Sequence, residues 1–162
     1  YATALLNKLK DYEDLEIILE PGRAIAANAG ILVAKVQYLK SNESRNFAIT
    51  DTGMNDMIRP ALYEAYMNII EIDRTLGREK AIYDVVGPVC ETSDFLGKQR
   101  ELAIAEGDYI AQRSAGAYGA SMSSNYNSRP RTAEVLVDRN KAHLIRRREN
   151  LSELWALESI AK

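Results

Sequence analysis

The stretch Ile31-Leu32-Val33-Ala34-Lys35-Val36-Gln37-Tyr38-Leu39-Lys40 begins apolar and then alternates between apolar and polar side chains. Alternation with a period of two is typical of a strand that buries one face and exposes the other. The polar residues 41–45 (SNESR) predict a hairpin connection, and residues 46–50 (NFAIT) predict the returning strand. Residues 31–50 therefore indicate antiparallel β structure.

More short strands are expected in the rest of the chain, separated by turn residues. They are predicted at 67–73, 81–86, 100–105, 109–112, 133–137 and 141–145. Helical turns are expected within 57–66, around Pro60, and a short helix is expected at 151–161. Many short strands at close spacing are typical of an antiparallel barrel or sandwich. The fold class predicted for this part of the chain is therefore mainly β.

The first 25 residues have a different sequence pattern. Residues 2–10 have good helix formers with leucines on one face, residues 11–14 form a polar turn, and residues 15–19 (LEIIL) predict a buried strand. A helix, a polar turn and a buried strand are typical of a parallel α/β unit. Because such a strand needs neighbours, we expect them to lie before Tyr1, in a longer protein.

Composition narrows the classes of function. The chain has 162 residues, enough for one domain with a real core, and a net charge of -2, so neither nucleic acid nor a membrane is expected as a partner. No apolar run approaches the roughly 18 residues that span a bilayer. A single cysteine permits no internal disulfide and favours a cytoplasmic location. No His/Cys/Asp/Glu cluster has metal-ligand spacing, so no metal site is predicted.

Four loop segments carry the groups best suited to chemistry. They are EPGR at 20–23, RPALY at 59–63, GPVCETSD at 87–94 and GAYGASMSSNYNSRPR at 116–131. Loops that follow rigid strands are where reactive side chains are usually presented. For Glu20 and Arg23 the alternative interpretation is a local ion pair, which contributes only about 0–1 kcal/mol when exposed.

Single residues in these loops have alternative interpretations. Cys90 could be a small buried hydrophobe, although the Gly-Pro before it and the polar residues after it are poor core material. Tyr118 lies among small residues that permit close approach, yet a packing tyrosine is the alternative. Outside the loops, His143 and the arginines at 146–148 are interpreted as surface groups, and Trp155 as a core anchor for the last helix.

Together, the four segments resemble the fold-type III pyridoxal-phosphate decarboxylases, and most closely the diaminopimelate decarboxylases among them. The segments occur in the family's order, and the resemblance covers nearly the whole chain. It implies a (β/α)8 barrel followed by a C-terminal β-barrel. Residues 1–25 would be the closing segment of the first barrel, and residues 26–162 the C-terminal β-barrel domain.

The resemblance also implies a role for each matching residue. Glu20 would face the pyridine nitrogen of pyridoxal 5'-phosphate and keep it protonated, and Cys90 would return a proton to the α-carbon after decarboxylation. The full set is cofactor-binding Glu20, Pro21, Gly22, Arg23 and Tyr118, and substrate-binding Arg23, Arg59, Tyr63, Glu91 and Tyr118. The loop with Cys90 and Glu91 would reach into the partner subunit's site, which implies a homodimer.

One departure from the family concerns lysine. The family's Schiff-base lysine and most of its phosphate cradle lie upstream of these residues, and no lysine here lies in a matching motif. We therefore expect the chain alone to be inactive.

The expected reaction is decarboxylation of meso-2,6-diaminopimelate to L-lysine and CO2. The substrate's distal carboxylate needs an extra cation, which Arg23 or Arg59 supplies, and Glu91 stands where relatives acting on ornithine typically have aspartate. One alternative is a sister decarboxylase acting on ornithine, arginine or carboxynorspermidine. Another is a non-catalytic, truncated partner, suggested by the missing lysine.

Overall fold

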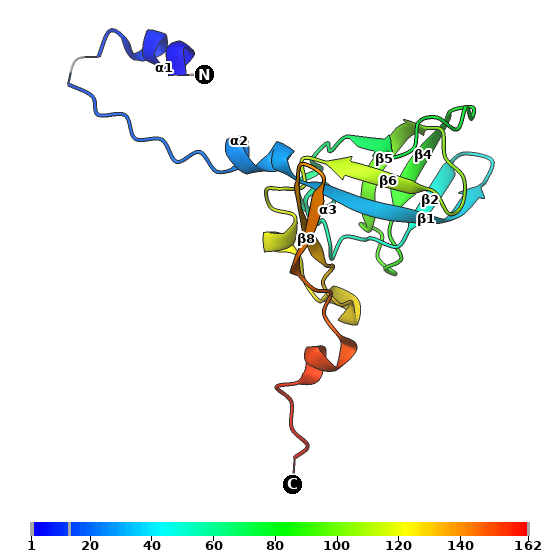
Figure 1. The fold of residues 1–162 in the computed structure, drawn as a ribbon. Helices are drawn as coiled ribbons and strands as arrows, with labels where there is room; N and C mark the ends of the chain where they lie inside the picture. The colour runs from blue at the N-terminus through cyan, green and yellow to red at the C-terminus, as the bar shows by residue number, and fades with distance from the viewer. Residues whose placement is uncertain (1, 13, 162) are drawn as a thin grey trace.

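The computed structural model describes residues 2–12 and 14–161. Their main body is a six-stranded sheet that curves into a barrel, with a separate two-stranded hairpin beside it (Figure 1). The large sheet contains β1 (Ile31–Ser41), β2 (Asn46–Thr50), β3 (Ile69–Glu71), β4 (Ala81–Val86), β5 (Phe95–Leu102) and β6 (Tyr109–Arg113) in the order β3-β6-β1-β2-β4-β5. The hairpin contains β7 (Glu134–Asp138) and β8 (Lys141–Arg146).

Strand β1 is the longest element and joins two parts of the sheet. Its first half pairs with β6 from Ile31 to Lys35, and its second half pairs with β2 from Val36 to Ser41. The register shifts between Val36 and Tyr38, and such bulges bend a strand and increase its twist. The strand can therefore belong to both sides of a curved sheet, which confirms the prediction made from residues 31–50.

The sheet is nearly closed around an apolar core. The terminal strands β3 and β5 contact each other, and the side-chain amide of Gln112 on β6 donates a hydrogen bond to the Leu96 carbonyl on β5, 3.0 Å away. The buried side chains include Val36, Val85, Leu96, Leu102 and Ile110, each 1% exposed or less. Burying a side chain of this size contributes about 1.5–3 kcal/mol.

Two details of the sheet differ from the prediction. In the described chain all of its pairings are antiparallel except that of β2 with β4, which is parallel. Strand β5 begins at Phe95 rather than at residue 100, and Gln99 inside it has a positive φ of 54°. The alternation that marks a strand is interrupted there, which explains why the sequence pattern missed its first half.

Short helices precede, connect or follow the strands. They are α1 (Ala2–Leu9), α2 (Arg23–Ala26), η1 (Ala27–Ala29), α3 (Arg59–Tyr63), η2 (Ala120–Met122), η3 (Tyr126–Ser128) and η4 (Leu151–Trp155). The predicted C-terminal helix is thus limited to one 3-10 helix, η4. Trp155 is 52% exposed, so its assignment as a core anchor is wrong.

The prediction of a strand at 15–19 is also wrong for this structure. These residues have no strand assignment, and Ile18 is 77% exposed. A strand forms by pairing, and the described residues provide no partner strand next to this segment. The predicted helix before it is present as α1, whereas the predicted turn at 11–14 includes Glu13, which lies outside the described residues.

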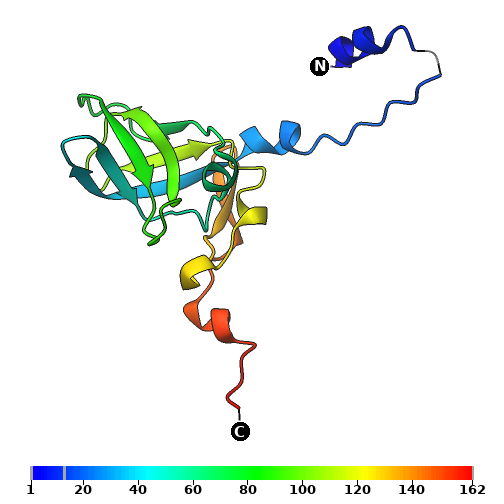
Figure 2. The ribbon, with the colours of Figure 1, turned by 180° about the vertical axis from the view of Figure 1, so that it is seen from behind.

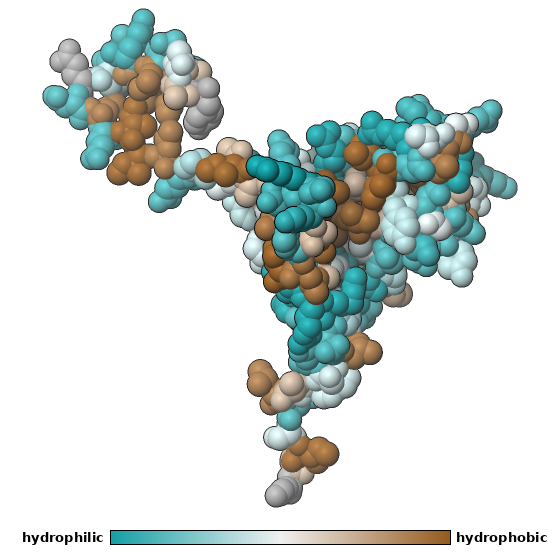
Figure 3. Space-filling view, viewed as in Figure 1, coloured by the Kyte–Doolittle hydropathy of each residue, from teal (hydrophilic) through white to brown (hydrophobic). Residues whose placement is uncertain are grey.

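Two segments project from the barrel in both views. The run from α1 to α2 extends from one side, and the hairpin and η4 extend from another (Figures 1 and 2). Hydrophobic atoms are visible on the surface of α1 in the space-filling view (Figure 3). Within residues 2–12 and 14–161, the helices are too short or too polar to cross a bilayer.

Candidate functional site

The segment EPGR leads from the extended run into α2 and is exposed throughout. The carbonyl of Gly22 accepts hydrogen bonds from the amides of Ile25 and Ala26, so the glycine begins the helix. A side-chain carbon placed on Gly22 would lie 3.9 Å from the hydroxyl of Tyr118. The structure therefore brings the end of the first predicted motif next to the tyrosine of the fourth.

Hydrogen bonds between backbones join the segment that follows EPGR to the start of the fourth motif. The amide of Gly116 donates to the Ala27 carbonyl at 3.0 Å, and the amide of Ala115 donates to the Gly30 carbonyl at 2.9 Å. A side chain on Gly116 would collide with the carbonyl of Ala26. Only glycine allows this close approach of the two backbones, so its place in the GAYGA sequence has a structural reason.

Arg59, Tyr63 and Tyr118 form what we call the arginine–tyrosine cluster. The guanidinium carbon of Arg59 lies 5.2 Å from the ring centre of Tyr63 and 5.1 Å from that of Tyr118. Cation–π contacts of this kind contribute about 0.5–1 kcal/mol at exposed sites. Tyr118 has a positive φ of 62°, an uncommon conformation for a residue other than glycine.

Residues 87–94, which we call the cysteine loop, are shaped by Asp94. One carboxylate oxygen of Asp94 accepts a hydrogen bond from the Met54 amide at 2.6 Å, and the other accepts one from the Val89 amide at 2.6 Å. Asp94 is 4% exposed, and burial raises the pKa of its carboxyl group, with the two hydrogen bonds acting in the opposite direction. Cys90 and Glu91 are exposed at the surface of this loop.

Residues 124–131, the tyrosine loop, lie beside the cysteine loop. The hydroxyl of Tyr126 donates a hydrogen bond to Oε2 of Glu91, 3.4 Å away. The side chain of Arg129 donates to Oδ1 of Asn55 at 2.9 Å and to the Asp51 carbonyl at 2.6 Å. The tyrosine loop is thereby attached to the barrel next to the cysteine loop.

Residues 52–57, the base loop, support the whole arrangement. Its Met54 amide binds Asp94, its Asn55 accepts from Arg129, and it leads directly into α3, which carries Arg59 and Tyr63. Burial raises the pKa of Asp56 in this loop, opposed by a hydrogen bond from the Gly53 amide. In the sequence, the Gly, Asn and Asp residues of this loop are the one signal of a tightly hydrogen-bonded turn.

The structure thus brings Arg59, Tyr63 and Tyr118 together and places Cys90 beside Glu91. No hydrogen bond or ion pair between described residues joins the arginine–tyrosine cluster to Cys90 or Glu91. Within residues 2–12 and 14–161, no cluster of three or more His, Cys, Asp or Glu side chains could hold a metal ion.

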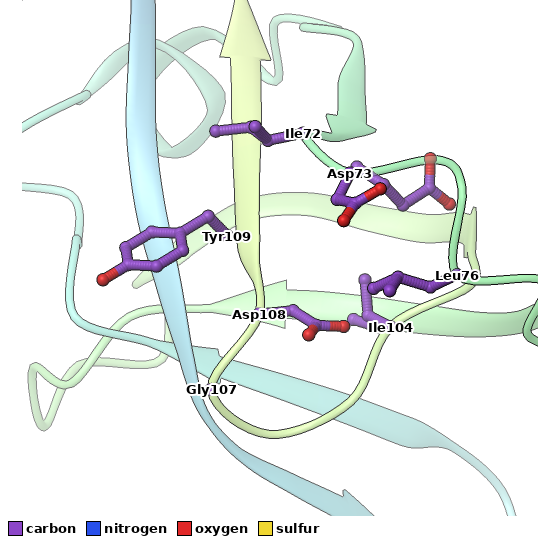
Figure 4. A pocket seen from close by; sticks show the side chains of 8 residues that line it. Ile72, Asp73, Leu76, Ile104, Gly107, Asp108 and Tyr109 are labelled. Atoms are coloured by element: carbon purple, nitrogen blue, oxygen red, sulfur yellow. The ribbon is translucent and has the colours of Figure 1, made fainter.

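The hollow drawn in Figure 4 lies elsewhere and is small, about 200 Å³. It is lined by Glu71, Ile72, Asp73, Leu76, Ile104, Gly107, Asp108 and Tyr109. Asp108 already pairs with Arg78, and Glu71 accepts a hydrogen bond from the Ala103 amide. None of the predicted site residues lines this hollow.

A β-barrel whose loops carry these motifs matches a known domain. Residues 12–116 match the family model described as the C-terminal sheet domain of pyridoxal-dependent decarboxylases. The chain therefore belongs to the pyridoxal-dependent decarboxylase family.

Particular members of the family are very similar to this chain. It is 89% identical over 159 residues to the diaminopimelate decarboxylase of Haemophilus influenzae and 64% identical over 160 residues to that of Vibrio cholerae. These alignments cover 98% and 99% of this chain but 38% of each relative. The chain thus spans little more than a third of the length of these relatives.

A solved structure agrees with this assignment. The diaminopimelate decarboxylase of Helicobacter pylori, crystallised in complex with L-lysine, superposes with a TM-score of 0.85 at 47% identity. The superposition covers 97% of this chain and 38% of that protein's chain.

Proposed function

We propose that this chain is the C-terminal part of a pyridoxal-phosphate-dependent diaminopimelate decarboxylase, which converts meso-2,6-diaminopimelate to L-lysine and CO2. The observation that carries the proposal is the 89% identity to a diaminopimelate decarboxylase over 98% of the chain. The exposed motif residues described above support it, because they present the carboxylate, guanidinium, phenol and thiol groups that this reaction needs.

The residues present fit one side of the proposed cofactor. Pyridoxal 5'-phosphate, when bound, withdraws electrons from the substrate's α-carbon so that CO2 can leave. Glu20 offers an exposed carboxylate for a ring N–H, and the Tyr118 hydroxyl lies close to Gly22, so groups from the first and fourth motifs are near each other. With Pro21 and Arg23, these residues would contact the cofactor from this side. The Schiff-base lysine would come from the part of the enzyme that precedes this chain.

The arginine–tyrosine cluster is suited to binding a substrate carboxylate. The guanidinium presents a planar set of N–H donors, which matches the two oxygens of a carboxylate. The two rings that flank Arg59 restrict its orientation, and the exposed hydroxyl of Tyr63 offers a further hydrogen bond. Arg23, which is exposed, provides a second cation beside the half-buried Arg59. Two arginines suit a substrate with two carboxylates better than ornithine, which has one.

The cysteine loop would supply the other half of the chemistry. The thiol of Cys90 is exposed and would donate a proton to the substrate's α-carbon once CO2 has left. The neighbouring carboxylate of Glu91 would bind the substrate's distal ammonium group by a charge-assisted hydrogen bond.

The two halves would meet across a homodimer interface. The cysteine loop of one subunit would face the arginine–tyrosine cluster of its partner. The absence of a polar contact between the two groups within the described part of one chain is compatible with this arrangement.

The substrate is tested by comparing turnover in the complete enzyme. We expect kcat/KM for meso-2,6-diaminopimelate to exceed that for ornithine by at least about 10³-fold, because without a distal carboxylate one binding arginine is left unpaired. Arg23→Gln and Arg59→Gln should each reduce this preference. Equal or greater turnover of ornithine would contradict the proposed substrate and favour a sister decarboxylase.

A further inference from the structure

The hydroxyl of Tyr126 is the nearest described hydrogen-bonding partner of the Glu91 carboxylate. It lies 3.4 Å from Oε2, longer than the 2.5–3.0 Å usual for an O–H···O hydrogen bond. Hydrogen bonds in active sites are often long before the substrate binds and shorten in its complex. The other carboxylate oxygen of Glu91, Oε1, has no hydrogen-bond partner among the described residues and remains available.

Tyr126 is held in this place by the loop that carries it. The side-chain amide of Asn125 donates hydrogen bonds to the Arg129 carbonyl at 3.0 Å and to Oε2 of Glu149 at 2.6 Å. Glu149 also accepts from the backbone and side chain of Arg131 at 2.8 and 3.0 Å. The backbone hydrogen bond from Arg131 is the main reason that the pKa of Glu149 lies below its ordinary value. These contacts fix the backbone on both sides of the tyrosine.

The backbone after Tyr126 adopts an uncommon conformation. Asn127 has a φ of 58° and Ser128 a φ of 54°, although neither is glycine. Each such residue costs of order 1 kcal/mol or more and persists only when surrounding contacts require it. The contacts of Asn125, Arg129 and Arg131 meet that requirement.

The backbone of Glu91, in the cysteine loop, is also held in place by hydrogen bonds. Its amide donates to the Val89 carbonyl at 2.8 Å, and its carbonyl accepts from the Asp94 amide at 3.0 Å. The base loop binds both neighbours, because Met54 donates to Asp94 and the Asn55 carbonyl accepts from the Ser124 amide at 2.9 Å. The distance between the cysteine loop and the tyrosine loop is therefore set by one short segment of backbone.

We infer that Tyr126 is a positioning residue for Glu91: its hydroxyl holds one carboxylate oxygen so that the other faces the distal ammonium of the substrate. This inference rests on the function proposed above. A phenol suits the task because it donates one hydrogen bond and carries no charge that would compete with the ammonium. It leaves proton transfer by Cys90 unaffected, so its contribution lies in substrate binding.

The test uses the complete enzyme and the substitution Tyr126→Phe, which removes only the hydroxyl. We expect KM for meso-2,6-diaminopimelate to rise about threefold to tenfold, the effect of losing one hydrogen bond, with kcat changed by less than about twofold. The matched control is Tyr38→Phe in β1, where the tyrosine is 65% exposed and its hydroxyl binds no described residue. It should change neither constant.

A double-mutant cycle separates positioning from a general structural role. Glu91→Ala should raise KM more than Tyr126→Phe does, and adding Tyr126→Phe to Glu91→Ala should have no further effect on kcat/KM. A full additional loss in the double variant, or a fall in kcat without a rise in KM, would overturn the inference.

The outcomes also distinguish the two proposals. If Glu91→Ala raises KM and Tyr126→Phe does not, the positioning role fails while the proposed function stands. If the unsubstituted enzyme does not decarboxylate diaminopimelate, both proposals fail.

Discussion

The arginine–tyrosine cluster and the cysteine loop are held in place by different forces. Arg59 lies between two aromatic rings at 5.1 and 5.2 Å, contacts that restrict its plane but allow the side chain to shift. The cysteine loop is fixed by two hydrogen bonds of 2.6 Å to the buried carboxylate of Asp94. Binding a carboxylate tolerates small displacements, whereas proton transfer requires donor and acceptor within hydrogen-bond reach. The loop to which we assign proton transfer is the one held by backbone amides that donate to a buried carboxylate.

The largest expected effect follows from removing the thiol. We expect Cys90→Ala in the complete enzyme to lower kcat for diaminopimelate by about 10²–10⁴-fold, the usual contribution of a positioned proton donor. The matched control is Thr92→Ala in the same exposed loop, where the side chain makes no hydrogen bond to a described residue. Steady-state kinetics give both numbers, and unchanged turnover by Cys90→Ala would exclude the thiol as the donor.

A smaller effect is expected from loosening the loop itself. Asp94→Asn replaces one acceptor oxygen with an amide nitrogen that must face the backbone N–H of Met54 or Val89. We expect the free energy of unfolding to fall by about 1–3 kcal/mol, and kcat to fall with it. Denaturant unfolding of the complete enzyme measures the free energy of unfolding. The control is Asp138→Asn, at an exposed position on the hairpin.

Burial acts against this expectation, because it makes the charged carboxylate of Asp94 costly. The raised pKa of Asp94 reflects that cost. A more stable Asp94→Asn variant would show that the cost of the buried charge exceeds the gain from its two hydrogen bonds.

The smallest effect concerns the support of the tyrosine loop and depends on pH. The pKa of Glu149 is lowered from 4.5 by hydrogen bonds from Arg131 and Asn125, so its carboxylate stabilises the folded state. That contribution is fully present above pH 4.5 and is lost as the pH falls through the lowered pKa of the folded state. The stability difference between wild type and Glu149→Gln should therefore shrink as the pH falls from 6 toward 3. Urea unfolding at a series of pH values measures it, and a constant difference would contradict the assigned role.

Much of the fold could be predicted from residue patterns. Alternating side chains gave β1, β2 and β4 with nearly the observed bounds. The parallel pairing of β2 with β4 could not be predicted, because alternation identifies a strand but not its neighbour. The prediction of a strand at 15–19 is wrong for a related reason. An apolar run becomes a strand only where a partner strand is present, and the pattern does not show whether one is.

The sequence proposed residues for the candidate site, but it could not indicate the contacts that hold them in place. Arg59, Cys90 and Tyr118 were selected because the motifs that contain them resemble those of a known family, and their roles stay predictions. The contacts of the base loop could not be predicted, because Met54 binds Asp94 across 40 residues and Asn55 binds Arg129 across 74. Tyr126 lies within the fourth motif, but the resemblance implies no role for it. Its 3.4 Å contact with Glu91 is the observation that suggests one.

The central claim is that the cysteine loop and the arginine–tyrosine cluster of one chain serve two different active sites of a homodimer. The most direct test mixes two complete enzymes of strongly reduced activity, Cys90→Ala and Arg59→Ala, at a substrate concentration well below KM, and allows their subunits to exchange. Each mixed dimer would then contain one intact site, and random exchange should restore about a quarter of the wild-type activity. The same mixture before exchange should keep its strongly reduced activity. No recovery after verified exchange would contradict the claim, because it would mean that both residues act within the same subunit.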